Sequence, residues 1–159
     1  MRRPLVLVAL AAVLATAACD ADDDGDAPPA ATTGDRVARV TDGDTVVLER
    51  LGRTRLIGID TPEVYPVAAC FGRAAADRME DLLPRGTRVR YAFDRERRDR
   101  YGRALVFLYK RDVLLNAELL REGFARPLRV PPNTSRAERF DRLARDARRD
   151  GRGLWSRCE

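Results

Sequence analysis

The segment Arg55-Leu56-Ile57-Gly58-Ile59-Asp60-Thr61-Pro62-Glu63 decides the fold, because a short apolar run ends there in two carboxylates that are three residues apart. The run is typical of a buried strand, and Gly58 inside it predicts a bulge or a close approach of backbone. Pro62 cannot donate a ladder hydrogen bond, so we predict that the strand ends in a bend with Asp60 and Glu63 at its rim. On its own, such an acid pair can simply cap a turn and meet solvent.

Two short strands precede this segment and form a meander with it. The first is predicted over Val37–Val40 and the second over Thr45–Glu49. Asp42-Gly43 supplies the turn between them, and Leu51-Gly52 supplies the turn into the third strand.

The elements that follow complete the order expected of an OB-fold. Apolar spacing predicts a helix over Phe71–Leu83, ended by Pro84 and Gly86. The remaining expected elements are strands over Thr87–Phe93 and Leu105–Tyr109 and helices over Leu114–Glu122 and Ser135–Asp150. We therefore predict an α+β protein, an OB-fold five-stranded Greek-key β-barrel with three helices.

The two ends of the chain differ in character. Residues 1–19 combine Arg2 and Arg3 with an apolar run and a small-residue ending at Cys19, which is typical of an export signal. The ending resembles the lipobox of bacterial lipoproteins, so we expect lipidation of Cys19 and an outward-facing membrane lipoprotein, with ordinary cleavage and secretion as the alternative. Residues 20–35 are acidic and predict a flexible tether, which leaves 36–159 as the folded domain, expected to be a monomer.

Composition restricts the chemistry of any site. The 159 residues contain no histidine, which excludes imidazole bases and histidine-ligated zinc and leaves carboxylates as the expected catalytic bases. Residues 36–159 carry 28 basic and 19 acidic side chains, and this excess favours a polyanionic partner, either nucleic acid or anionic lipid. Cys70 and Cys158 remain after processing, and an even pair in an exported chain predicts a disulfide, with two free thiols as the alternative.

A second acidic motif, Asp42-Gly43-Asp44-Thr45, precedes the strand that should neighbour the opening segment. It is not half of an EF-hand, because the positions that require a bidentate acid are arginines 53 and 55. Its carboxylates can instead meet Asp60 and Glu63 across the strand pair. Acidic oxygens without histidine or cysteine favour calcium or another hard cation.

Two arginines complete the candidate site. Arg55 leaves the same strand as Asp60, and Arg103 precedes the predicted fifth strand in Asp99-Arg100-Tyr101-Gly102-Arg103. Two guanidinium groups facing a cation would bind a phosphodiester between them. A carboxylate that does not bind the cation would then be available to deprotonate water.

The motifs resemble the staphylococcal nuclease-like, or thermonuclease, family over residues 37–155. The resemblance rests on four motifs: residues 40–45, residues 55–63, residues 99–103 and Gly153-Leu154-Trp155-Ser156. It implies a calcium-dependent phosphodiesterase on an OB-fold that cuts both DNA and RNA and leaves 3'-phosphates and 5'-hydroxyls.

The resemblance also assigns roles to individual residues. It implies that calcium is held by Asp44, Asp60 and the backbone carbonyl of Thr61. It implies that Glu63 is the general base, that Arg55 and Arg103 bind the scissile phosphate, and that Arg100 and Tyr101 hold a terminal phosphate.

The chain departs from the family in one loop. Residues 126–133, Arg-Pro-Leu-Arg-Val-Pro-Pro-Asn, replace a longer tyrosine-bearing loop that packs on the nucleotide. Base preference is therefore not carried over, and we consider Arg129 as a substitute stacking group. Two other functions are compatible with the charge: an OB module that binds nucleic acid without cutting it, and a structural envelope lipoprotein that holds anionic polymer.

Overall fold

The computed structural model describes Pro29 and residues 32–158. The predicted signal peptide and the lipidation of Cys19 lie outside the described residues, as does most of the predicted tether. Strand β1 (Thr33–Val40) begins three residues before the predicted domain start at Arg36. Asp35 in this strand is buried and accepts a hydrogen bond from the backbone N–H of Leu51 at 3.0 Å, so the end of the expected tether belongs to the folded part.

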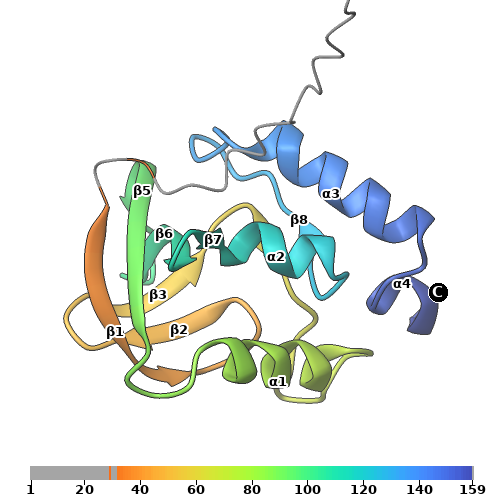
Figure 1. Ribbon diagram of the computed structural model, residues 1–159, viewed down its shortest axis with the longest axis horizontal. Helices are drawn as coiled ribbons and strands as arrows, with labels where there is room; N and C mark the ends of the chain where they lie inside the picture. The colour runs from red at the N-terminus through yellow and green to blue at the C-terminus, as the bar shows by residue number, and fades with distance from the viewer. Residues whose placement is uncertain (1–28, 30–31, 159) are drawn as a thin grey trace, which may run out of the picture.

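Five strands close into a barrel, with the helices gathered to one side of it (Figure 1). They are β1, β2 (Thr45–Leu48), β3 (Gly52–Leu56), β5 (Arg88–Arg98) and β6 (Ala104–Lys110). The order is β3-β2-β1-β5-β6, and parallel pairing of β3 with β6, in which Arg55 lies opposite Leu105, closes the barrel. The predicted OB-fold is confirmed. A short β7 (Val113–Leu114) adds to the end of β6.

The apolar run of the opening segment is not one strand, as predicted, but two. Strand β3 ends at Leu56, and β4 (Ile59–Asp60) leaves the barrel to pair with β8 (Arg126–Pro127). The break is at Gly58, whose φ of +79° suits glycine, and an added Cβ there would lie 2.6 Å from the Phe140 ring. The close approach expected at Gly58 is therefore present, but it marks a turn and not a bulge.

The helices match the predicted ones to within a few residues at each end. They are α1 (Gly72–Leu82), α2 (Leu115–Arg121) and α3 (Ala137–Arg149), followed by a one-turn α4 (Leu154–Arg157) that the sequence did not predict. Asn116 of α2 is fully buried, and its Nδ2 donates to the Ile57 carbonyl at 2.8 Å while its Oδ1 accepts from the Leu108 N–H at 3.0 Å. This side chain fixes the turn that leads into Asp60.

Candidate active site

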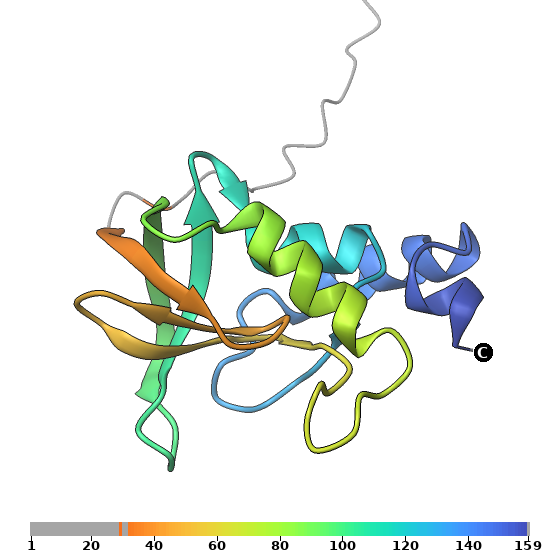
Figure 2. The same cartoon turned by 90° about the horizontal axis from the view of Figure 1, so that it is seen from below.

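Three connecting segments project from one edge of the barrel (Figure 2): the tip of the β5–β6 hairpin, residues 128–133, and residues 61–71. A cavity of about 370 Å³ opens among the first two and the end of β3. Its lining includes Arg55, Arg100, Tyr101, Arg103, Leu128 and Val130. Four predicted site residues thus share one cavity.

Asp44 is held at the start of β2 by the turn that precedes it. The side chain is buried, and its Oδ2 accepts hydrogen bonds from the N–H and the hydroxyl of Thr61 at 2.8 and 3.0 Å. The Asp44 N–H donates to Oδ1 of Asp42 at 3.1 Å, which shapes the turn. An added Cβ on Gly43 would lie 2.9 Å from the Thr61 side chain, so the glycine of the acidic motif makes room for Thr61.

Arg55 joins the two carboxylates that the family resemblance assigned to the metal. It lies opposite Thr45 in the β2–β3 pair, and its side chain is only 14% exposed. One terminal nitrogen forms an ion pair with Asp44, and the other lies 2.9 Å from Asp60 Oδ1. Burial lowers the pKa of Arg55, and the charges of Asp60 and Asp42 oppose that shift. The guanidinium is thus the cation that these carboxylates share.

Asp42 is a residue of the site to which the sequence gave no separate role. Burial raises the pKa of Asp42 above its ordinary value, although a hydrogen bond with Thr45 and the charges of Arg55 and Arg103 pull it down. The charges of both arginines therefore act on Asp42, which is not among the assigned ligands. Its place two residues before Asp44 in the motif was the available signal.

Arg103 is oriented by Asp99 across the tip of the hairpin. Its Nε donates to Asp99 Oδ2 at 2.7 Å and its backbone N–H donates to Oδ1 at 2.9 Å. Burial raises the pKa of Asp99, but the hydrogen bonds and charge of Arg103 outweigh it, so the pKa lies below its ordinary value. Asp99 stays ionised at neutral pH and holds the guanidinium towards the cavity.

Two guanidinium groups lie over the Tyr101 ring at the same tip. The Arg100 Cζ is 4.8 Å and the Arg103 Cζ 5.5 Å from its ring centroid, and Arg100 also donates to the Tyr101 hydroxyl at 2.7 Å. The ring is 63% exposed, so it offers the cavity an aromatic face flanked by positive charge.

Glu63 stands apart from this network. It is exposed on the segment between β4 and α1, and its side chain makes no hydrogen bond or ion pair with any residue that the structure describes. Within the described ranges, no group of three or more acidic or cysteine side chains is placed to surround a metal ion. The structure therefore brings together two of the three predicted acids, Asp44 and Asp60, and leaves Glu63 nearby in sequence but separate.

The oxygens of the residues assigned to the metal can nevertheless be compared with the ligands that a hard cation prefers. Asp44 and Asp60 contact the same guanidinium, so their oxygens converge within reach of a single positive charge. Carboxylate and carbonyl oxygens are the ligands that calcium takes, usually completed by water. These residues fit calcium on the condition that Arg55 moves off the two carboxylates.

The tyrosine-free loop contributes aliphatic side chains. Leu128 and Val130 line the cavity and are 40% and 54% exposed. Asn133 pins the loop to β5 by exchanging hydrogen bonds of 2.8 and 2.9 Å with the Glu96 backbone. This pairing accompanies the extension of β5 to Arg98, five residues beyond its predicted end.

Arg129, considered above as a substitute stacking group, pairs with a residue of α3 in this structure, and its stacking on a nucleotide stays a prediction. Its guanidinium forms an ion pair with Asp141 of α3 and does not line the cavity of Arg55 and Arg103. A carboxylate on a neighbouring helix, which loop composition does not reveal, decides the direction of the side chain.

Comparison with known proteins agrees with the fold and the motifs. A family model described as staphylococcal nuclease homologue matches residues 53–157. The thermonuclease of Staphylococcus intermedius is 37% identical over 128 residues, which cover 76% of this chain and 75% of that protein. Endonuclease YncB of Bacillus subtilis is 33% identical over 127 residues, covering 75% of this chain and 60% of that protein. The SPbeta prophage-derived endonuclease YokF of the same species is also 33% identical, with 75% and 43% covered.

Proposed function

The chain belongs to the staphylococcal nuclease homologue family, and from this we propose that it is a calcium-dependent nuclease that hydrolyses phosphodiester bonds in DNA and RNA. The observation that carries the proposal is that Arg55 and Arg103 line one cavity and that Arg55 also contacts Asp44 and Asp60. Two guanidinium groups suit a phosphate, and two carboxylates suit the cation that such chemistry uses.

In this proposal, Arg55 and Arg103 bind two oxygens of the scissile phosphate. Both are held by carboxylates in the absence of substrate, Arg55 by Asp44 and Asp60 and Arg103 by Asp99. Their charge stabilises the extra negative charge that develops on the phosphate oxygens in the transition state. Tyr101, with Arg100, provides a second place where a phosphate or a base can rest.

Glu63 is proposed as the base that takes a proton from the attacking water. The water oxygen bonds to phosphorus, and the bond from phosphorus to the 5' oxygen breaks. Arg103 is proposed to donate a hydrogen bond to the departing 5' oxygen, which takes a proton from solvent water and leaves as a 5'-hydroxyl, so that the other product ends in a 3'-phosphate. A calcium ion bound by Asp44, Asp60 and the Thr61 carbonyl would polarise the phosphate and lower the pKa of bound water.

Removing the metal tests this function directly. Purified protein incubated with single-stranded DNA and calcium is expected to cut it. A chelator is expected to lower the rate at least about 100-fold, because the metal charge that would polarise the phosphate and activate the water is then missing. Gel electrophoresis measures cleavage of the DNA, filter binding measures its retention by the protein, and mass spectrometry identifies the product ends. Cleavage at the same rate in chelator contradicts the metal requirement, and binding without cleavage in calcium supports a binding module instead.

We also propose that the chain is exported and held at the membrane through Cys19. The support is the pattern of residues 1–19 and a disulfide between Cys70 and Cys158, a bond typical of oxidising compartments. The helices in the described part of the chain are not long and apolar enough to cross a membrane. Mass spectrometry of the membrane fraction should find a lipidated Cys19, and recovery of only unmodified protein from the medium would contradict the anchor.

A further inference from the structure

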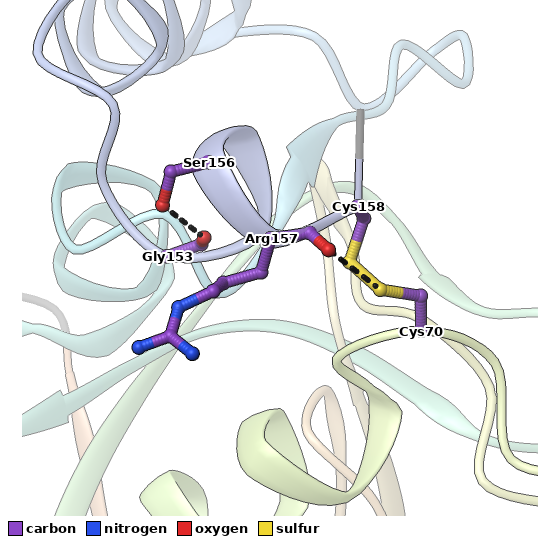
Figure 3. The surroundings of a disulfide bond; sticks show 5 residues. All are labelled: Cys70, Gly153, Ser156, Arg157 and Cys158. Carbon is purple, nitrogen blue, oxygen red and sulfur yellow. Dashed lines mark hydrogen bonds between the residues drawn. A yellow bond between two sulfur atoms is a disulfide. The ribbon is translucent and has the colours of Figure 1, made fainter.

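A disulfide joins the segment that carries Glu63 to the C-terminal end of the domain (Figure 3). Cys70 lies two residues before the start of α1 and Cys158 directly follows α4, with a sequence separation of 88 between them. Neither cysteine lines the cavity of Arg55 and Arg103. The disulfide is therefore connected to the proposed catalytic residues through the segment between Glu63 and α1.

The residues next to the bridge pack directly on the backbone of Glu63. The Ala69 N–H donates to the Glu63 carbonyl at 2.8 Å, and the Gly72 N–H donates to the Ala69 carbonyl at 2.9 Å. A Cβ on Gly72 would overlap the Glu63 carbonyl oxygen and lie 3.0 Å from that of Pro62. The start of α1 and the backbone of Glu63 are thus in contact, and neither can shift without the other.

The segment needs outside support to keep this shape. Phe71, between Cys70 and Gly72, has a φ of +69°, a left-handed conformation that is uncommon for a bulky residue. Its ring packs on Phe124, with centroids 5.3 Å apart. The loop tip offers no such support, because Tyr65 and Val67 are 77% and 81% exposed.

The other end of the bridge rests on a fixed part of the domain. The Leu154 N–H of α4 donates to the Gly123 carbonyl at 2.9 Å. A Cβ on Gly153 would overlap the Gly123 carbonyl oxygen, so the two backbones are in close contact at the end of α2. Contacts of α4 with the end of α2 therefore hold Cys158 in place. The disulfide in turn restricts the position of Cys70.

We infer that the Cys70–Cys158 bridge and Gly72 position Glu63, so that the enzyme reaches full turnover only when the two thiols are oxidised. This inference rests on the proposed role of Glu63. Oxidation forms the S–S bond by thiol–disulfide exchange with a disulfide oxidant, which accepts two electrons and two protons as it becomes a dithiol. A chain that is still in the reducing compartment where it is made would cut nucleic acid slowly and gain turnover after export.

The test compares kcat and KM on single-stranded DNA in calcium for three forms: oxidised wild type, wild type reduced with dithiothreitol, and Cys70→Ser/Cys158→Ser. Both forms without the bridge are expected to lose kcat by on the order of 10- to 100-fold, the scale of a misplaced catalytic group, with KM changed less than about twofold. Near-UV circular dichroism at the assay temperature confirms that each form is folded. Leu48→Ala, a core truncation at the β2–β3 turn, is the control for lost stability and should keep its kcat.

A glycine pair repeats the test with the disulfide intact. Gly72→Ala should lower kcat because its Cβ displaces the Glu63 backbone, whereas Gly34→Ala, where the nearest atom would be 3.9 Å away, should not. Equal kcat for the folded bridge variants and wild type would overturn the inference.

A double-mutant cycle separates positioning from a purely structural role. In a Glu63→Gln background, loss of the bridge should lower kcat no further, because the group that the bridge positions is already gone. Multiplicative losses would overturn the inference. If Glu63→Gln itself has wild-type kcat, it is the proposed role of Glu63 that fails.

Discussion

Replacing Glu63 with glutamine is expected to lower kcat by about 10²- to 10⁴-fold, the range that a positioned general base contributes. Glutamine keeps the size and polarity of the side chain but cannot accept a proton from water at neutral pH. The free energy of unfolding should change by less than about 0.5 kcal/mol, because Glu63 is exposed and its carboxylate bonds to no described residue. The measurement is single-turnover cleavage of DNA with saturating calcium, beside thermal unfolding.

The matched control for this variant is Glu80→Gln on the exposed face of α1, which removes the same charge outside the cavity. It should retain the wild-type rate. A similar loss in both variants would point to net charge and not to a base. Wild-type turnover in the Glu63 variant would remove this residue from the mechanism and leave Asp42 as the next carboxylate to examine, because Arg55 and Arg103 act on it directly.

The barrel could be predicted from the sequence because its signals are local. Turn dipeptides such as Asp42-Gly43 and the alternation of short apolar strands are set by neighbouring residues, and they give the strand order of the meander correctly. The break at Gly58 could not be located in this way. It depends on Phe140, which is 82 residues away in sequence and packs against the glycine.

The sequence predicted part of the site's membership and not its ion pairs. Its motifs include Asp44, Asp60 and Arg55, which the structure brings together, but they also include Glu63, which stands apart, and they gave Asp42 no separate role. Which guanidinium contacts which carboxylate depends on distances across strands. The ion pairs that Arg55 makes with Asp44 and Asp60 are of this kind, and so is the pairing of Arg129 with Asp141. Sequence predicts that such groups gather, and three-dimensional packing decides the pairs.

Replacing Arg55 with glutamine is expected to lower stability and turnover but to raise calcium affinity. The metal-free variant should lose about 3 kcal/mol of unfolding free energy, because Asp44, only 6% exposed, keeps its charge without a cation. Turnover should fall about 10²- to 10³-fold, since the donor that we propose for the transition-state phosphate is lost. Thermal unfolding in chelator and DNA cleavage in calcium measure the two effects.

Calcium affinity should change in the opposite direction and rise in the Arg55→Gln variant. In the wild type a cation at Asp44 and Asp60 must displace a guanidinium that already contacts both carboxylates, and the variant removes this competitor. Calcium alone, titrated calorimetrically, should therefore bind the variant more tightly and restore more of its stability than it adds to the wild type. Arg53→Gln, an exposed arginine two residues earlier on β3, should change neither quantity. Weaker calcium binding by the Arg55 variant would mean that the guanidinium and the metal do not compete for these two acids, and the metal site would then have to lie elsewhere.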